Sequence, residues 1–247
     1  MKAMVLAAGL GTRLRPLTND RPKALVEIDG KTLLEITLAR LLSAGVSEVI
    51  VNTHHFADKV EAFLRSRSWG MRVEISREET LLDTGGGLKQ AAWFFLEPGK
   101  DETGPFLLHN VDVLSTINLV AMARAHRERG ALATLAVQDR ATSRPLLFDE
   151  HEQLCGRRVG SADPELVGPV KTSHALAFAG IHVLSPEIFA KLTEEGVFPV
   201  VPAYLRLAAQ GERILAYRAD NAYWRDLGKP ENVKQAEQDV RGGIYSA

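Results

Sequence analysis

The 247-residue sequence has few features of a secreted or membrane-bound protein. Its one cysteine, Cys155, cannot form an internal disulfide, which is typical of a protein from a reducing compartment. No stretch approaches the roughly 18 consecutive apolar residues that a membrane-spanning helix needs. The apolar residues 4–8 run directly into a polar loop, unlike the apolar core of a signal peptide. We therefore expect a cytoplasmic protein without a membrane partner.

The sequence also lacks an excess of charge of either sign. Thirty Lys and Arg residues are matched by 31 Asp and Glu residues, so the net charge is −1. Nucleic-acid-binding domains usually show an excess of basic residues, and we expect no nucleic-acid partner. Hydrophobic residues make up 45% of the chain, which excludes a mostly disordered protein. We expect a monomer or a small homo-oligomer.

Short apolar runs alternate with helical patterns along the first 137 residues. The patterns predict strands at 2–6, 48–52, 71–76 and 106–109, and helices at 32–44, 57–67 and 84–96. Such alternation is typical of a mostly parallel sheet with helices on both faces, which binds ligands at the carboxyl ends of its strands. We therefore predict an α/β fold, a Rossmann-like three-layer sandwich with a mostly parallel mixed sheet.

The patterns in the second half are less regular, and residues 140–173 are rich in Arg, Pro and Gly. We predict helices at 118–129, 186–192, 199–210 and 230–240, and strands at 131–137, 145–148, 154–158, 175–184 and 213–217. The sequence shows no repeat or linker. We expect a single domain over residues 1–247 that carries a small additional lobe.

A glycine-rich basic loop follows the first strand. Gly9 and Gly11 let the backbone approach a ligand and present amide groups to oxyanions. Arg13 offers a bidentate fork for phosphate, and Lys23 adds a movable positive charge. The loop favours a polyphosphate ligand, and a tight turn with solvated arginines is the alternative. It is neither a dinucleotide fingerprint, because Pro16 prevents the required helix, nor a Walker loop.

Two aspartates occur in short polar motifs far apart in the sequence. Asp112 follows the strand predicted at 106–109, where a carboxylate can hold Mg²⁺ together with phosphates and water. Taken alone, Asn110 and Asp112 could instead form a turn or cap the helix predicted from Asn118. Asp226 could likewise lie in a simple surface turn.

These motifs together resemble one enzyme family. The matching segments are Gly9–Leu14 with Pro16–Thr18, Pro22–Lys23, Asn110–Asp112 and Trp224–Gly228. In this order they resemble the sugar-1-phosphate nucleotidyltransferases over most of the chain. Those enzymes join a nucleoside triphosphate to a sugar 1-phosphate and release pyrophosphate, and the resemblance implies these two substrates and Mg²⁺ as the cofactor.

The resemblance assigns the catalytic roles to four residues. Arg13 would neutralise the leaving pyrophosphate, and Lys23 would contact the α-phosphate or the incoming phosphate. Asp112 and Asp226 would hold Mg²⁺ between them. Two other classes of protein are alternatives. A non-catalytic nucleotide-sugar sensor or regulatory subunit would be expected to lose such residues. A glycosyltransferase would not explain the loop that carries Arg13 and Lys23.

The resemblance also implies two binding subsites. The glycines at residues 85–87 would leave backbone amides free at a helix entrance and admit a flat base, and a simple glycine-rich helix cap is the alternative. The expected nucleotide-binding residues are Ala8, Gly9, Gly11, Thr12, Arg13, Glu78, Asp83 and Thr84. The expected sugar-binding residues are Asn110, Gly180 and Lys171, although the Glu-Lys-Pro motif of many members is missing. Arg144 and Arg158 could reach an acid or a phosphate.

The resemblance implies a division of the chain and a substrate pair. Residues 1–137 would bind the nucleotide, about 138–220 would form a small sugar-side lobe, and 221–247 would supply the second metal aspartate and a closing helix. The compact length, the Asp-Thr-Gly-Gly-Gly loop at residues 83–87 and the missing Glu-Lys-Pro are most similar to the single-domain branch that transfers uridylyl from UTP to N-acetylmuramate 1-phosphate in peptidoglycan recycling. Mannose-1-phosphate guanylyltransferases are the alternative.

Overall fold

The computed structural model describes residues 1–98, 104–168 and 170–245. The helices in this part of the chain are α1 (Leu33–Ser43), α2 (Ala57–Arg65), α3 (Asp83–Gln90), α4 (Ala92–Phe95), α5 (Leu119–Glu128), α6 (Ile188–Lys191), α7 (Val200–Ala209) and α8 (Pro230–Arg241), with 3-10 turns η1 (Thr12–Leu14) and η2 (Lys23–Leu25). The strands are β1 (Lys2–Leu6), β2 (Glu27–Ile28), β3 (Lys31–Thr32), β4 (Glu48–Thr53), β5 (Arg72–Arg77), β6 (Phe106–Asn110), β7 (Val113–Ser115), β8 (Ala133–Gln138), β9 (Leu146–Phe148), β10 (Leu154–Arg157), β11 (Glu165–Leu166), β12 (His174–Leu184), β13 (Ile214–Arg218) and β14 (Trp224–Asp226).

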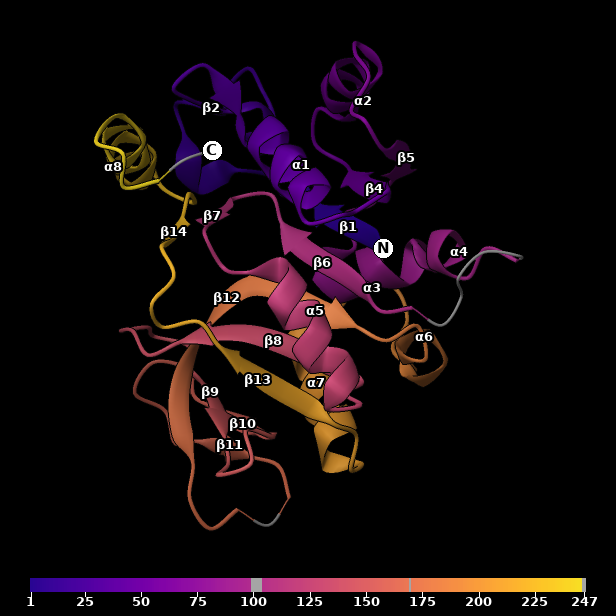
Figure 1. Ribbon diagram of the computed structural model, residues 1–247, viewed down its shortest axis with the longest axis vertical. Coiled ribbons are helices and arrows are strands. Elements are labelled where there is room, and N and C mark those ends of the chain that lie inside the picture. The colour runs from indigo at the N-terminus through magenta and orange to yellow at the C-terminus, as the bar shows by residue number, and fades with distance from the viewer. Residues whose placement is uncertain (99–103, 169, 246–247) are drawn as a thin grey trace.

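A large mixed sheet forms the centre of the molecule (Figure 1). β1 runs parallel to β4 and β6, and β5 runs parallel to β4. β12 is antiparallel to both β6 and β8, while β13 pairs with β8 in parallel. The predicted α/β fold with a mixed sheet is confirmed, and the core strands of the sheet, β6, β1, β4 and β5, are parallel.

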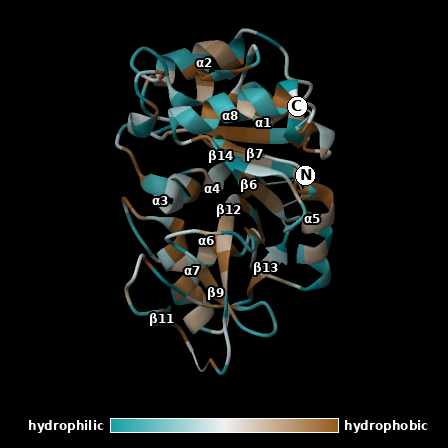
Figure 2. Ribbon diagram, turned by 90° about the vertical axis from the view of Figure 1, so that its left-hand side faces the viewer, coloured by the Kyte–Doolittle hydropathy of each residue, from teal (hydrophilic) through white to brown (hydrophobic). Residues whose placement is uncertain are grey.

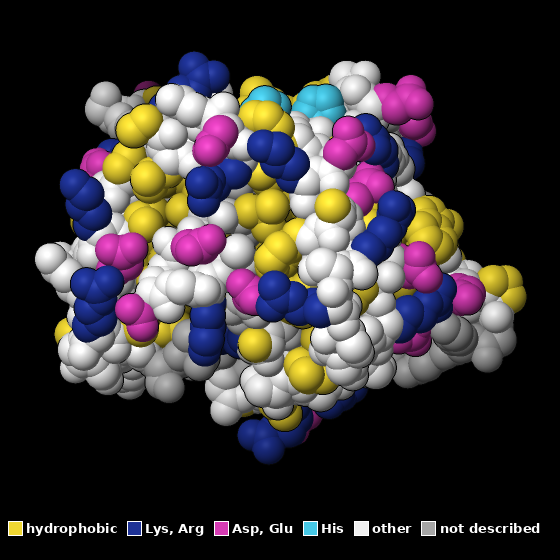
Figure 3. All heavy atoms as spheres, turned by 90° about the horizontal axis from the view of Figure 1, so that it is seen from above, with side chains coloured by type: hydrophobic (Ala, Val, Ile, Leu, Met, Phe, Trp, Pro, Cys, Tyr) yellow, Lys and Arg dark blue, Asp and Glu magenta, His cyan; other side chains and the backbone are white. Residues whose placement is uncertain are grey.

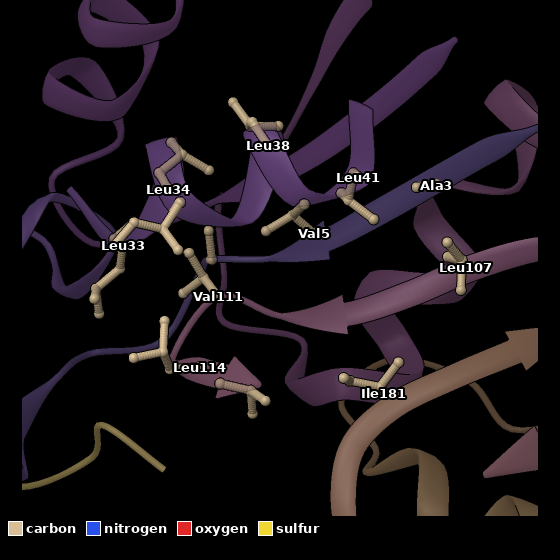
Figure 4. Close-up of a cluster of buried hydrophobic side chains, with 14 of the residues drawn as sticks. Ala3, Val5, Leu33, Leu34, Leu38, Leu41, Leu107, Val111, Leu114 and Ile181 are labelled. Carbon is tan, nitrogen blue, oxygen red and sulfur yellow. The ribbon is translucent and has the colours of Figure 1, made fainter. Parts of the chain in front are cut away.

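Side chains of β1, which lies between β4 and β6, point alternately to the two faces of the sheet, and each face is covered by helices. Ala3 and Val5 lie in a buried cluster with apolar residues of α1, α2, α5 and α8, part of which is shown in Figure 4. Met4 belongs to a second buried cluster that includes residues of α3, α4, α6 and α7. Figure 2 shows α3 and α7 on one side of β12 and α5 on the other. This arrangement is the expected three-layer sandwich.

The structure differs from the predicted elements at a few places. The helix predicted at 84–96 is divided into α3 and α4 at Ala91. The helix predicted at 186–192 is reduced to α6, because Leu192 adopts an extended conformation. The short strands β2, β3, β7, β11 and β14 were not predicted, since two or three residues are too few to show a periodic pattern.

β12 connects the main sheet to a small lobe formed by β9, β10 and β11 (Figure 1). Its last residues pair with β6, whereas residues 174–176 pair with β9. The register against β8 shifts between Phe178 and His182, and Gly180 between them has a φ of 73°. Only glycine adopts this conformation without strain. The bend brings Gly180 against Asn110, because a Cβ at residue 180 would lie 2.9 Å from the Asn110 Nδ2 atom.

Three histidines are buried in the core in their neutral form. Burial lowers the pKa of His109 and of His126 to about 4, and that of His182 to about 3. The ring of His182 is hydrogen-bonded to the Tyr204 hydroxyl at 2.8 Å. An exposed histidine titrates near pH 6.5, so the unfolded chain binds protons that the native chain does not bind.

We therefore expect the free energy of unfolding to fall as the pH drops from 7 toward 4. Each buried histidine should contribute a loss of about 2 kcal/mol at pH 5. Urea unfolding at pH 7 and pH 5 measures the difference, and NMR should show these three imidazoles still neutral at pH 5. Equal stability at both pH values would contradict the neutral assignment.

Within residues 1–98, 104–168 and 170–245, no helix combines the length and apolar character needed to cross a bilayer. The end of the molecule near α2 and α8 carries acidic and basic side chains that are intermingled over its surface (Figure 3). This distribution agrees with the nearly balanced charge of the sequence.

Candidate active site

Two cavities meet at the carboxyl end of β6. The first has a volume of about 380 Å³ and the second of about 500 Å³. Asn110, the last residue of β6, and Asp112, which follows it, line both cavities. Two ligands bound in these cavities would therefore meet beside Asp112. This is the edge of the sheet where the fold predicts ligand binding.

The first cavity contains many of the predicted nucleotide-binding residues. Its lining includes Ala8, Gly9, Glu78, Asp83 and Thr84. Lys23 also lines it, whereas Gly11, Thr12 and Arg13 do not. Segments after β1, β5 and β6 and Asn52 near the end of β4 contribute to the lining, so the cavity follows the strand ends.

The basic loop after β1 closes onto Lys23. Gly11 has a φ of 66°, and its carbonyl accepts a hydrogen bond of 2.8 Å from the Thr18 hydroxyl. A Cβ at residue 11 would lie 3.1 Å from Thr18 Cγ2 and 3.3 Å from Lys23 Cβ. The Lys23 ammonium donates a hydrogen bond to the Asp112 carboxylate. The loop therefore places a positive charge at the junction of the two cavities.

A buried polar network supports the wall of the first cavity. Asn52, at 2% exposure, accepts a hydrogen bond of 2.7 Å from the Ala7 amide and donates one of 2.7 Å to Glu78. The other Glu78 oxygen accepts a bond of 2.9 Å from the Leu82 amide. Both Glu78 oxygens are thus engaged by the protein itself, and this carboxylate orients the loop that was expected to contact the base. Asn52 was not among the predicted site residues, because its only signal in the sequence is a polar residue near the end of a buried strand.

The glycines at residues 85–87 have a different role from the one predicted. They lie inside α3, and the amides of Gly85 and Gly86 donate to the Phe198 carbonyl at 2.9 and 3.2 Å. A Cβ at residue 85 would lie 2.3 Å from the Phe198 ring, and one at residue 86 would lie 2.4 Å from the Gly196 carbonyl. The expectation of free amides beside a base is wrong for Gly85 and Gly86. Their amides are already hydrogen-bonded to Phe198, in the segment before α7.

The second aspartate lies beside the first through an unpredicted pair of strands. Asp226 in β14 is opposite Val113 of β7, and the Leu227 amide donates to the Asp112 carbonyl at 2.8 Å. The surface-turn alternative for Asp226 is therefore wrong. Asp112 lies before β7, and Asn118 itself caps α5, so the capping alternative for Asp112 is also wrong.

Arg13 lies near Asp226 although it is outside both cavity linings. A Cβ at Gly228 would lie 3.0 Å from Arg13 Nη2 and 2.8 Å from Asp226 Oδ1. The Gly228 amide donates a hydrogen bond of 2.6 Å to the same Asp226 oxygen. The four residues expected to be catalytic therefore converge from the two ends of the chain and from β6.

The second cavity extends from the two aspartates into the small lobe. Asn110 and Gly180, two of the three residues predicted to bind the sugar, line it together with Asp112 and Asp226. Lys171 is exposed and lines neither cavity. Other residues of the lining are Arg140, Arg144, Arg157, Arg158, Phe178 and Trp224. Arg144 and Arg158 were among the candidates from the sequence, whereas Arg140 was not, because its only signal is a basic residue shortly after a strand.

Comparison with known proteins agrees with this geometry. Residues 2–146 match the family described as nucleotidyl transferase. An N-acetylmuramate alpha-1-phosphate uridylyltransferase from Caulobacter vibrioides is 38% identical and covers 95% of both chains. A mannose-1-phosphate guanylyltransferase from Mycobacterium tuberculosis is 30% identical over 98% of this chain and 65% of that one. The structure of a UDP-glucose pyrophosphorylase complexed with UDP-glucose has a TM-score of 0.77 at 18% identity, with 98% of both chains covered.

The chain belongs to the nucleotidyl transferase family. Within that family it is a sugar-1-phosphate nucleotidyltransferase, an enzyme of nucleotide-sugar biosynthesis. The resemblance inferred from the sequence motifs is confirmed, and the sensor and glycosyltransferase alternatives are wrong.

The Asn52 network leads to a first prediction about the site. We expect Asn52→Ala to destabilise the protein by about 2–5 kcal/mol, because two buried partners lose their hydrogen bonds. The Michaelis constant for the nucleotide should rise as well, since the Ala7 loop lines the first cavity. Thermal unfolding and steady-state kinetics measure both effects. Asn19→Ala, at an exposed position of the basic loop, is the matched control. Unchanged stability in Asn52→Ala would contradict the network.

Proposed function

We propose that this enzyme transfers a uridylyl group from UTP to N-acetylmuramate 1-phosphate and releases pyrophosphate. The observation that carries the proposal is the meeting of the two cavities at Asp112, with Lys23 and Asp226 beside it. The similarity to the Caulobacter vibrioides uridylyltransferase, which extends over nearly the whole of both chains, supports this substrate pair. The proposed setting is peptidoglycan recycling in the cytoplasm.

The proposed division of the chain follows the two cavities. The nucleotide would bind in the first cavity, against Ala8, Gly9, Asp83 and Thr84, in residues 1–137. The sugar would bind in the second cavity beside Asn110, with residues of about 138–220 around it. The last part of the chain would contribute Asp226.

In the proposed reaction, a phosphate oxygen of the sugar attacks the α-phosphorus of UTP in line. The new P–O bond forms as the bond to pyrophosphate breaks, and pyrophosphate leaves with the electron pair. A phosphate monoester is already anionic, so positioning and charge neutralisation supply the catalysis and no strong base is needed. Lys23 would stabilise charge at the reacting phosphates, and Arg13 would stabilise the leaving pyrophosphate.

The pair of aspartates fits a magnesium ion. Mg²⁺ is usually held by one or two carboxylates together with substrate phosphates and water, and not by a cage of protein ligands. Asp112 and Asp226 both line the second cavity, and within the described ranges no group of three or more His, Cys, Asp or Glu residues could hold a metal. We propose that these two carboxylates hold Mg²⁺, which when bound would neutralise phosphate charge.

The direct test measures pyrophosphate release with UTP, GTP, ATP and dTTP against several sugar 1-phosphates. These sugars include N-acetylmuramate, N-acetylglucosamine, glucose and mannose. Release that is highest with UTP and N-acetylmuramate 1-phosphate, and that stops with EDTA, would support the proposal. A preference for GTP with mannose 1-phosphate would contradict the proposed substrate pair. It would favour the alternative for which the similarity to the Mycobacterium tuberculosis enzyme speaks.

A further inference from the structure

The second cavity contains more positive charge than a sugar phosphate requires. Of its four arginines, Arg157 pairs with Glu165 at 2.6 Å. Arg140, Arg144 and Arg158 form no ion pair with any residue in the described part of the chain. The acidic residues in the lining are Asp112 and Asp226, whose charges a bound Mg²⁺ would neutralise. Three cations therefore remain for the ligand, whereas a phosphate monoester carries at most two negative charges.

Arg140 lies at the end of the cavity where the reaction would occur. Its guanidinium lies 3.5 Å from the centre of the Trp224 ring, and its Nη2 donates to the Phe178 carbonyl at 2.8 Å. Trp224 is held in turn by a hydrogen bond of 2.8 Å from its indole to the Ala179 carbonyl. Trp224 and Asp226 belong to the same short strand β14. This fixed cation is therefore suited to the phosphate of the sugar.

Arg144 and Arg158 lie in the small lobe, on two adjacent segments. The Arg158 amide donates a hydrogen bond of 3.0 Å to the carbonyl of Pro145, the residue after Arg144. This bond continues the antiparallel pairing in which Arg157 is opposite Leu146. Both side chains are exposed, and both residues line the same cavity. Two cations that line one cavity favour an anionic ligand there.

We propose that Arg144 and Arg158 bind a carboxylate on the sugar and so select an acidic sugar 1-phosphate over neutral ones. This inference rests on the proposed function and deepens it, since it assigns residues that distinguish N-acetylmuramate, with its lactyl carboxylate, from N-acetylglucosamine. Guanidinium groups match a carboxylate with paired hydrogen bonds, which an uncharged sugar hydroxyl cannot replace. The missing Glu-Lys-Pro lysine agrees with a sugar site built on arginines.

The test compares N-acetylmuramate 1-phosphate with its lactyl methyl ester, which keeps the sugar and removes the carboxylate charge. The wild-type enzyme should prefer the acid by about 10- to 100-fold in kcat/KM, as expected for hydrogen bonds to a charged group. Arg144→Gln and Arg158→Gln should each reduce this preference, and the double variant should abolish it. Thermal unfolding of each variant beside the wild-type enzyme shows whether the variants are folded, and the preference is compared as the ratio of kcat/KM for acid and ester within each variant.

Arg127→Gln is the matched control, because Arg127 is exposed on α5 and lines neither cavity. It should keep the wild-type preference for the acid. Equal use of the acid and the ester by the wild-type enzyme would overturn this inference. The proposed reaction would still be supported in that case if pyrophosphate release depends on UTP. Preference for a neutral sugar would also overturn the inference. The absence of release with every sugar 1-phosphate would instead overturn the proposed function itself.

Discussion

Asp112→Asn is expected to lower kcat by about 10²- to 10³-fold, the effect typical of removing one electrostatic contact to a transition state. The substitution keeps the shape of the side chain but removes the negative charge at the junction of the two cavities. The affinity for UTP should change much less, because most of the first cavity is formed by other residues. Steady-state kinetics give kcat, and equilibrium binding of UTP gives the affinity.

The control for this variant is Asp163→Asn, an exposed aspartate of the small lobe. It should have wild-type kcat. Thermal unfolding of Asp112→Asn is needed as well, because the partly buried Lys23 loses its ion-pair partner. Full activity in Asp112→Asn would contradict the proposal that the Asp112 carboxylate holds Mg²⁺.

Lys23→Gln is expected to lower kcat/KM for UTP by a similar factor of about 10²–10³. Lys23 lines the first cavity, and its ammonium contacts the Asp112 carboxylate, so it is the cation at the point where the phosphates would meet. Lys31→Gln, at an exposed lysine of β3, is the control and should leave kcat/KM unchanged. An unchanged rate in Lys23→Gln would show that the Lys23 charge does not act on the substrate.

A double-mutant cycle separates the two roles of Lys23. If Lys23 and Asp112 act as one unit, the double variant should lose less activity than the product of the two single losses. Fully multiplicative losses would indicate that the two side chains act on separate steps. The same cycle followed by thermal unfolding reports how strongly the pair stabilises the fold.

Much of the fold was predictable because it depends on local periodicity. The helix pattern at 32–44 and the apolar run at 48–52 correspond closely to α1 and β4. α1 begins with a capping box between Thr32 and Glu35, a signal within four residues of sequence. The short strands β7 and β14 escaped prediction, because each is stable only through its pairing with the other.

The candidate site was predictable to a smaller extent. Lys23 and Asp112 were chosen from motifs, and the structure brings them into contact. The role of Gly85 was misjudged, because the need for glycine comes from Phe198, more than a hundred residues away. Arg140 was missed, since its position over Trp224 joins two segments with no sequence relation.

The sequence by itself determined the sheet, its helices and the family of enzyme, because alternating apolar runs and short phosphate-binding motifs are local properties of the chain. Only the tertiary structure decided how the parts form a site. It placed Asp226 beside Asp112 through the pairing of β14 with β7, and it brought Arg144 and Arg158 into the lining of one cavity. It also left Lys171 exposed and outside both cavities. The physical reason is that such contacts arise from the pairing and packing of distant segments, which no local pattern encodes.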